Sequence, residues 1–302
     1  MLTWTVGAGG LLGSALTRQV CNPFNASPVA WNDQYASGVA LKKNLDRFCA
    51  DVGDGEWAII WAAGAATVAI GQAQADVELS TFRAFIDAVS AHAPAGAGRF
   101  LLASSAGGVY AGATGPPFAA ATAPAPLGVY GHLKMAQEAG AVEGLRNTCP
   151  VVVARIANLY GPGQNLTKLQ GLVSRLAWCA ATQEPANIFV PLDTIRDYVY
   201  VDDAARSCLQ ALTNAAHPSE VAVIASGRPV TVGQLIRTVQ QVTKRHVPVG
   251  LGSHSSARDQ VLDLRLAPSM EIDQQTPLPV GVKNVFLDIL RRLQERSSAK
   301  SA

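Results

Sequence analysis

Tyr130 and Lys134 stand four residues apart in the stretch from Gly128 to Lys134. On a helix this spacing places both side chains on one face, about one turn apart. A free phenol has a pKa of about 10, and a nearby ammonium group lowers that value because it favours the phenolate. Such a pair can exchange a proton with a sugar or alcohol oxygen near neutral pH. The spacing therefore predicts an acid/base centre, although Tyr-x-x-x-Lys also arises by chance.

A glycine-rich turn near the start of the chain could hold a pyrophosphate. Leu2 to Val6 predicts a strand, and an apolar helical pattern follows from Ser14 to Val20. Glycines let the backbone approach phosphate oxygens, and the N-terminus of the helix offers free N–H groups. The spacing is Gly-x-x-Gly-x-x-Gly rather than the stricter Gly-x-Gly-x-x-Gly, so its place after the first strand carries most of the weight. The residues predicted to bind a dinucleotide here are Gly7, Gly10, Leu11, Leu12 and Gly13.

The stretch from Val29 to Trp31 predicts a second strand, which Asn32 and Asp33 follow. An acidic side chain at this point would bond the hydroxyls of the adenosine ribose and disfavour a 2′-phosphate, so it favours NAD over NADP. Lys42 and Lys43 could instead meet that phosphate. The alternative interpretation is that Asp33 only caps a turn.

Two further predicted strands end in residues that leave room for a ligand. Trp57 to Trp61 is followed by Ala62, Ala63 and Gly64, small residues at the carboxyl end of a strand, which we expect to contact the cofactor. Phe100 to Ala103 is followed by Ser104 and Ser105, two hydroxyls ahead of a pair of glycines. Taken alone, the serines are also typical turn residues.

The alternation of strands and helices predicts an α/β fold, a doubly wound parallel sheet of the Rossmann type. We expect a dinucleotide-binding domain over 1–163, to which 192–225 returns. A smaller, interleaved C-terminal lobe, 164–191 with 226–294, would bind the substrate. We expect a disordered tail over 295–302. Within the lobe the patterns predict helices over 166–181 and 280–293, and strands over 188–190 and 260–263.

Composition narrows the class of protein. The 302 residues are 49% hydrophobic and 15% charged, and a net charge of +2 argues against a nucleic-acid partner. Apolar runs are broken before they reach the length of a membrane span, and no signal peptide is evident at the N-terminus. Five scattered cysteines lack metal-ligand spacing and indicate reduced thiols. We therefore expect a cytoplasmic protein with no metal, membrane or nucleic-acid partner.

Six stretches together resemble the extended short-chain dehydrogenase/reductase family, specifically its NAD-dependent epimerase/dehydratase group, which acts on nucleotide sugars. They occur in the order typical of that family and span roughly residues 1 to 290. The matching stretches are Val6 to Gly13, Ala62 to Gly64, Ser104 to Tyr110, Tyr130 to Lys134, Arg155 to Gly163 and Arg196 to Asp203.

The resemblance implies a role for each matching residue. Tyr130 would be the general acid/base, and Lys134 would lower its pKa and bond the nicotinamide ribose. A serine would bond the reacting oxygen. Asn158 would face the substrate, and Arg196 would meet its diphosphate unless it only pairs with Asp197 or Asp202. Lys168 and Arg258 are further candidates for phosphate or base contacts. The resemblance also implies a homodimer, formed by the helices that hold 82–89 and 130–145.

The sequence departs from the family pattern near the catalytic hydroxyl. Ala106 stands where the group often carries Ser or Thr, so we expect Ser105 to supply the hydroxyl, with Ser104 in reserve. Gly107 and Gly108 stand where 4,6-dehydratases carry an Asp-Glu pair, which disfavours a dehydratase. The acid that normally contacts adenine is hard to find, and Asp51-Val52 is the best candidate.

Three functions stay open at this point. The leading hypothesis is an NAD(P)-dependent nucleotide-sugar epimerase that oxidises a sugar hydroxyl transiently. The alternative is an NAD(P)H-dependent reductase or dehydrogenase of a keto sugar or another carbonyl. The third is a nucleotide-binding relative with weak catalysis, which Ala106 motivates.

Overall fold

The computed structural model describes residues 1–166, 171–252 and 263–301, and its centre is a parallel sheet of five strands. The strands are β1 (Leu2–Val6), β2 (Trp57–Trp61), β3 (Gly98–Ser105), β4 (Val151–Ile156) and β9 (Ser219–Ile224), in the order β1-β2-β3-β4-β9. Val6 pairs with Trp61 across β1 and β2, so both strands end at the same edge of the sheet. The parallel α/β fold predicted from the sequence is confirmed.

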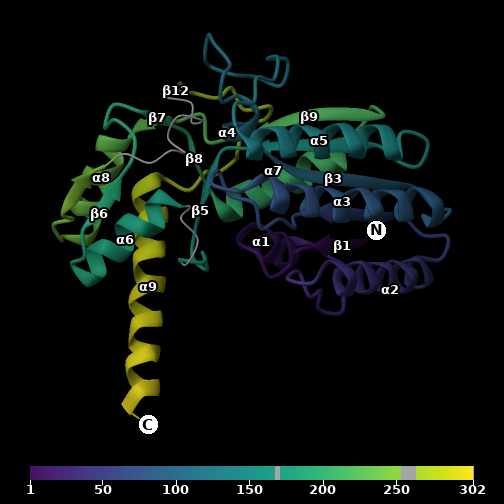
Figure 1. The fold of residues 1–302 in the computed structure, drawn as a ribbon, viewed down its shortest axis with the longest axis horizontal. Coiled ribbons are helices and arrows are strands. Elements are labelled where there is room, and N and C mark those ends of the chain that lie inside the picture. The colour runs from purple at the N-terminus through teal and green to yellow at the C-terminus, as the bar shows by residue number, and fades with distance from the viewer. Residues whose placement is uncertain (167–170, 253–262, 302) are drawn as a thin grey trace.

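Helices cover both faces of the sheet (Figure 1). One apolar cluster joins the sheet to α1 (Leu11–Gln19) and α7 (Val201–Asn214). The other joins it to α2 (Gln34–Val52), α3 (Gln72–His92) and α5 (Val129–Leu145). The side chains of β2 alternate between the clusters, with Ile60 in the first and Ile59 in the second, because successive residues of a strand point to opposite faces.

The predicted second strand is wrong. Val29, Ala30 and Trp31 form no strand, and the side chain of Trp31 is 47% exposed. The extended chain before them meets β1 only at an isolated bridge between Thr3 and Pro23. Beyond that bridge, Pro28 has no N–H group to offer a ladder. β1 is therefore the edge strand of the five-stranded sheet.

A side chain from α2 holds this segment in place of strand pairing. Asn44 accepts from the N–H of Ser27 at 2.8 Å and donates to the carbonyl of Ser27 at 3.0 Å. Asp51 and Val52, the candidate for the adenine contact, lie in the last turn of α2 rather than after a strand. The expectation that Asp51 follows a strand is therefore wrong.

A third apolar cluster lies outside the sheet, among helices that Figure 1 shows beside it. It joins α6 (Leu172–Thr182), α8 (Val232–Thr243) and α9 (Leu278–Ser301). Small strands border it, namely β5 (Asn158–Tyr160) with β8 (Tyr198–Tyr200), β6 (Ala186–Ile188) with β11 (Val249–Leu251), and β7 (Ile195–Arg196) between β10 (Val230–Thr231) and β12 (Asp263–Leu264).

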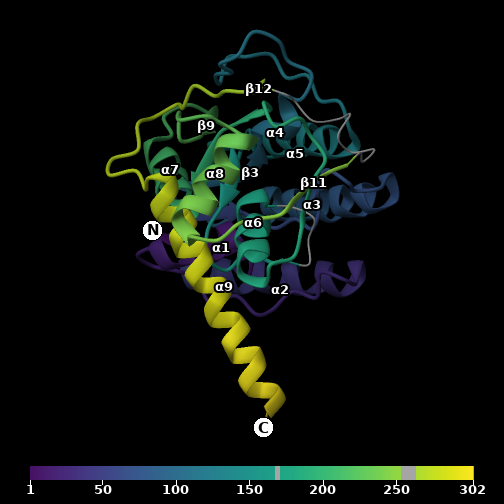
Figure 2. The ribbon, with the colours of Figure 1, turned by 90° about the vertical axis from the view of Figure 1, so that its left-hand side faces the viewer.

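Several element boundaries differ from the sequence prediction. The described part of the predicted helix over 166–181 begins at Leu172, and the strand expected over 188–190 is β6, which ends at Ile188. α9 continues to Ser301 and so includes most of the segment expected to be disordered. It leaves the body of the molecule as a single projecting helix in Figures 1 and 2.

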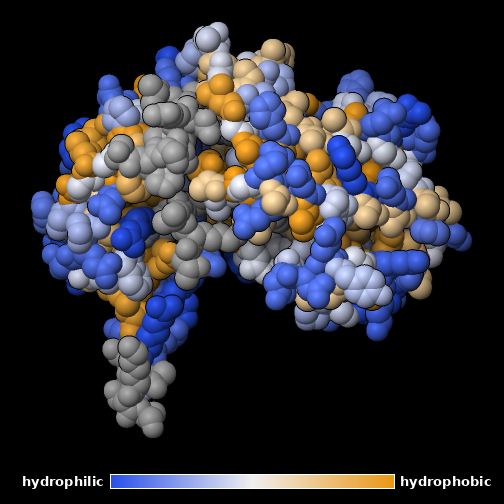
Figure 3. Space-filling view, in the orientation of Figure 1, coloured by the Kyte–Doolittle hydropathy of each residue, from blue (hydrophilic) through white to orange (hydrophobic). Residues whose placement is uncertain are grey.

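The face drawn in Figure 3 carries hydrophilic and hydrophobic residues interspersed, and α9 projects below it. Among the described residues, no helix has the length and apolar character needed to cross a membrane.

Candidate active site

The glycine turn packs directly onto the backbone that follows β2. Gly7 has a φ of +90°, and a Cβ there would lie 2.6 Å from the nitrogen of Ala63. A Cβ on Gly13 would lie 2.0 Å from the carbonyl oxygen of Gly7. Both positions therefore require glycine, and the two segments predicted to bind the cofactor, 7–13 and 62–64, lie against each other.

The start of α1 is built to receive an anion. Gly10 is its N-cap, donates to the carbonyl of Gly7 at 2.9 Å, and has no side-chain hydrogen bond that caps the helix. Leu12 is buried in the core, so only its backbone faces outward. The first N–H groups of a helix carry a partial positive charge, which suits a pyrophosphate. The turn therefore fits the phosphates of a dinucleotide.

Asp33 is the N-cap of α2. Its carboxylate accepts from the N–H of Ala36 at 2.9 Å, which is a capping role of the kind left open by the sequence. Asn32 and Asp33 are both exposed. The contact with the adenosine ribose predicted for them stays a prediction.

Tyr130 and Lys134 lie in the first turns of α5. The Nζ of Lys134 is 5.8 Å from the centroid of the Tyr130 ring, so the ammonium group lies beside the phenol. Lys134 is 6% exposed and donates to Oε1 of Gln137 at 2.9 Å. A Cβ on Gly64 would lie 3.8 Å from the same Nζ, which places Lys134 at the end of β2. Lys134 thus lies beside both the phenol and segment 62–64, which is predicted to bind the cofactor.

Gly108 contacts both Tyr130 and Ser105. α4 (Ala106–Val109) begins directly after β3, and Ser105 caps it by accepting from the N–H of Gly108 at 3.2 Å. A Cβ on Gly108 would lie 3.0 Å from two ring carbons of Tyr130, so the ring packs against this glycine. The hydroxyl of Ser105 can accept this bond and still donate its own hydrogen. A Cβ at residue 108 would therefore be in tight contact with the phenol ring.

Ser104, the reserve hydroxyl, is part of a buried structural network. It is 5% exposed and donates to Oε1 of Glu138 at 2.5 Å. Oε2 of Glu138 accepts from Arg155 at 2.7 Å, and Arg155 also donates to the hydroxyl of Tyr110 at 3.0 Å. Burial opposes the charge of Arg155, but its bonds to Glu138 and Tyr110 outweigh burial and raise its pKa. Ser104 is therefore tied to the core of the domain, and the role of catalytic hydroxyl predicted for Ser105 stays a prediction.

Arg196 lies on β7 and is buried, and burial lowers its pKa. The two carboxylates considered as its structural partners bind elsewhere. Asp202 pairs with Arg18 at 2.8 Å, and Asp197 accepts from the N–H groups of Ser226 and Gly227 at 2.7 and 2.8 Å. Burial raises the pKa of Asp197, and these two N–H groups oppose that effect.

Asn158 joins β5 to the turn before β8. Its backbone N–H and its Nδ2 both donate to the carbonyl of Asp197 at 3.0 Å. The side-chain oxygen is the group left to meet a substrate. Lys168 and Arg258, the other predicted contacts, lie outside the described residues.

Sequence reasoning missed the side chains that support Lys134 and Ser104. Gln137 and Glu138 are three and four residues beyond Lys134 on α5, and Glu78 lies on α3. A buried glutamine and glutamate on an otherwise apolar helix face were the available signal. Across the described part of the chain, His, Cys, Asp and Glu form no cluster of three or more that could hold a metal.

Comparison with known families shows which family the chain belongs to. The model of the NAD dependent epimerase/dehydratase family matches residues 5–225, which is most of the chain. The chain belongs to this family. The membership implied by the six stretches is therefore confirmed, and NAD, the cofactor predicted from the sequence, is the one for which the family is named.

Curated members of the family align with part of the chain. A dTDP-4-dehydro-6-deoxyglucose reductase of Escherichia coli is 27% identical over 180 residues, covering 57% of this chain and 55% of the reductase. A dTDP-L-rhamnose 4-epimerase of Burkholderia thailandensis is 29% identical over 126 residues, covering 41% of this chain and 35% of that enzyme. The alignments thus span about half and about a third of these relatives.

Solved structures share the whole fold. A UDP-glucose 4-epimerase of Thermotoga maritima, solved with UDP-glucose, superposes with a TM-score of 0.78. The match covers 97% of this chain and 100% of that one, at 20% identity. Other structures of the same fold were solved with NAD or with NADPH. At this identity the likeness shows the fold.

Proposed function

We propose that the protein is an NAD(P)-dependent nucleotide-sugar epimerase that oxidises and re-reduces one carbon of the sugar. The observation that supports this most is that the Tyr130 ring contacts Gly108, whose N–H bonds Ser105, and also lies beside the ammonium group of Lys134. A hydroxyl, a phenol and an ammonium group in series form the acid/base system that a sugar alcohol needs.

Each residue has a defined task in this proposal. Tyr130, as the phenolate, takes the proton of the sugar hydroxyl, and Ser105 donates a hydrogen bond to the same oxygen. The ammonium group of Lys134 stabilises the phenolate electrostatically. NAD, when bound, supplies the hydride acceptor and donor. When the keto sugar has turned in the site, Tyr130 returns the proton.

The cofactor and substrate occupy neighbouring parts of the site in this proposal. Gly7, Gly10 and Gly13 with the first turn of α1 hold the pyrophosphate, while Ala62 to Gly64 border the nicotinamide end. Arg196 and Asn158 face the nucleoside diphosphate of the substrate, where a buried guanidinium bonds phosphate oxygens strongly. Asn32 and Asp33 favour NAD over NADP at the adenosine ribose.

The second candidate is a reductase of a keto sugar. The alignment with a dTDP-sugar reductase is longer than that with the epimerase, at 180 against 126 residues. In that case the same Tyr130 would protonate the carbonyl oxygen, and reduced cofactor would be consumed.

We further expect a cytoplasmic homodimer formed through α3 and α5.

The two candidates separate in one experiment. The protein is incubated with UDP-, dTDP- and GDP-sugars in the presence of NAD⁺ or NADPH, while products and cofactor absorbance are followed. The epimerase yields an isomeric nucleotide sugar with no net change in reduced cofactor. Stoichiometric consumption of reduced cofactor in every productive reaction would reject the epimerase and favour the reductase.

A further inference from the structure

Glu78 connects α3 to two parts of the candidate active site. Its Oε2 accepts from the backbone N–H groups of Ala65 and Ala66 at 2.9 and 3.0 Å, in the loop that directly follows Ala62 to Gly64. Its Oε1 accepts from Nε2 of Gln137 at 3.4 Å. One carboxylate therefore holds the cofactor-binding loop and reaches α5.

Gln137 links Glu78 to Lys134 by one hydrogen bond to each. Its side chain is fully buried, its Nε2 faces Glu78, and its Oε1 accepts from Nζ of Lys134 at 2.9 Å. An amide can be turned so that either its oxygen or its NH₂ group faces a neighbour. The carboxylate of Glu78 accepts only from the NH₂ end, so it presents the oxygen to the ammonium group. Without it, the buried NH₂ group would lose this acceptor, and the amide could move to find another.

Gly64 shows how closely the two charged groups approach the same place. A Cβ on Gly64 would lie 3.1 Å from Oε1 of Glu78 and 3.8 Å from Nζ of Lys134. Both groups therefore border one small volume beside Gly64, an exposed residue that follows β2. In general an ammonium group favours the ionisation of a phenol and a carboxylate opposes it, so an effect of charge can be told from an effect of position.

We propose that Glu78 is a positioning residue that holds Lys134 beside Tyr130 through the amide of Gln137. The proposal deepens the proposed function, on which the role of Lys134 in the reaction rests. Glu78, Gln137 and Lys134 form a relay, and loss of either of the first two releases the ammonium group from its place.

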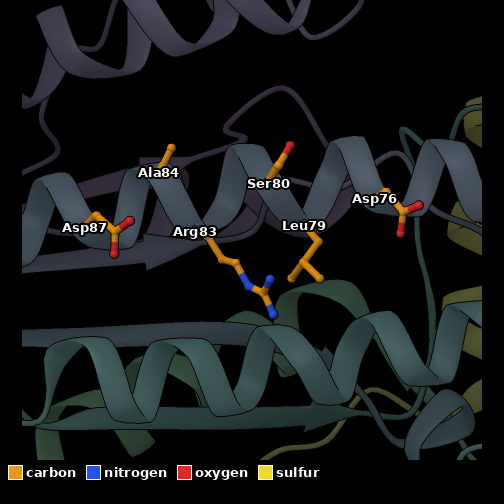
Figure 4. A pocket seen from close by; sticks show the side chains of 6 residues that line it. All are labelled: Asp76, Leu79, Ser80, Arg83, Ala84 and Asp87. Carbon is orange, nitrogen blue, oxygen red and sulfur yellow. The ribbon is translucent and has the colours of Figure 1, made fainter.

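The variants Glu78→Gln and Gln137→Met each break the relay at a different link. Asp87→Asn is the matched control, because it also removes one carboxylate from α3. Figure 4 shows Asp87 and Asp76 on the same helix, at opposite ends of a row of six side chains that line a depression. The depression is lined by Asp76, Leu79, Ser80, Arg83, Ala84 and Asp87, none of which belongs to the relay.

The test is a spectroscopic titration of Tyr130 that needs neither substrate nor turnover. The tyrosinate absorbance of each protein is followed with pH, and that of the same protein carrying Tyr130→Phe is subtracted. We expect the titration midpoint to rise by about 0.5 to 1 pH unit in Glu78→Gln and in Gln137→Met, because the ammonium group has moved away. The double variant should shift no further than either single one, because residues that act as a unit are not additive. Asp87→Asn should leave the midpoint in place.

Three outcomes would overturn the proposal. A lower midpoint in Glu78→Gln would show that the carboxylate acts by its charge alone, and an unchanged midpoint in both variants would show a merely structural role. Additive shifts in the double variant would show two independent effects. If the midpoints rise as expected but no nucleotide sugar is epimerised, the relay stands and the proposed function fails.

Discussion

Replacing Arg155 by Met should destabilise the protein strongly, because it leaves Glu138 charged and buried. Arg155 is 5% exposed, and its guanidinium makes three hydrogen bonds to Glu138, at 3.2, 3.2 and 2.7 Å, and one to Tyr110. After the change only Ser104 still bonds the carboxylate among these partners. Removing one partner of a buried ion pair costs about 3–5 kcal/mol. The number of bonds lost favours the upper part of that range.

The assay is equilibrium unfolding in urea, with Arg146→Met as the control. Arg146 pairs with Glu143 at 2.7 Å on the surface of α5, where the two side chains are 62% and 73% exposed. Loss of such a pair should cost less than about 0.5 kcal/mol. The double variant Arg155→Met with Glu138→Leu should recover part of the stability, because no unpaired charge stays buried. If Arg155→Met costs no more than Arg146→Met, the reasoning about the buried network is refuted.

Three further predictions concern other parts of the molecule. Ser105→Ala should lower kcat by about two orders of magnitude, as loss of one donor to a reacting oxygen does. Ser104→Ala should instead lower the free energy of unfolding by about 1–3 kcal/mol, because it leaves a buried carboxylate without one donor. A loss of kcat in Ser104→Ala and of stability in Ser105→Ala would exchange the two roles. Burial opposes the charge of Asp288, but the N–H of Gly163 and the guanidinium groups of Arg291 and Arg292 outweigh it and lower its pKa. The stability that it contributes is thus present above about pH 4 and lost as pH falls through its folded value. Thermal midpoints of the protein and of Asp288→Asn should therefore converge on acidification, and a constant difference would contradict this. Burial raises the pKa of Cys208 to about 12, so a thiol reagent at mildly alkaline pH should label exposed Cys21 at once and Cys208 only after denaturation, as mass spectrometry can show.

The features that could be predicted from the sequence depend on neighbours in the chain. Tyr130 and Lys134 lie within one helix, so their spacing alone brings them together. The turn from Gly7 to Gly13 is likewise local, and its place after an apolar strand pointed to the correct layer of the fold. The place of Ala63 just after a strand could also be predicted, because the alternation of strands and helices indicated a parallel sheet.

The features that could not be predicted depend on residues far apart in the chain. Val29 to Trp31 has the apolar character of a strand, but Asn44, seventeen residues beyond Ser27, holds the preceding segment in another arrangement. The bond of Ser104 to Glu138 comes from tertiary packing, and so does that of Gln137 to Glu78, which is 59 residues away. The sequence favoured Ser105 over Ser104, but the spacing could not reveal the bond that ties Ser104 to Glu138.

The central claim is that one carbon of a sugar is oxidised and re-reduced within a single turnover. The most direct measurement uses a nucleotide sugar that is accepted by the protein and carries deuterium at the carbon that is inverted. We expect the isomeric product to retain the deuterium at that carbon, because the hydrogen removed is returned without exchange with water. Loss of the label to solvent, or its transfer to cofactor released in stoichiometric amounts, would contradict the account.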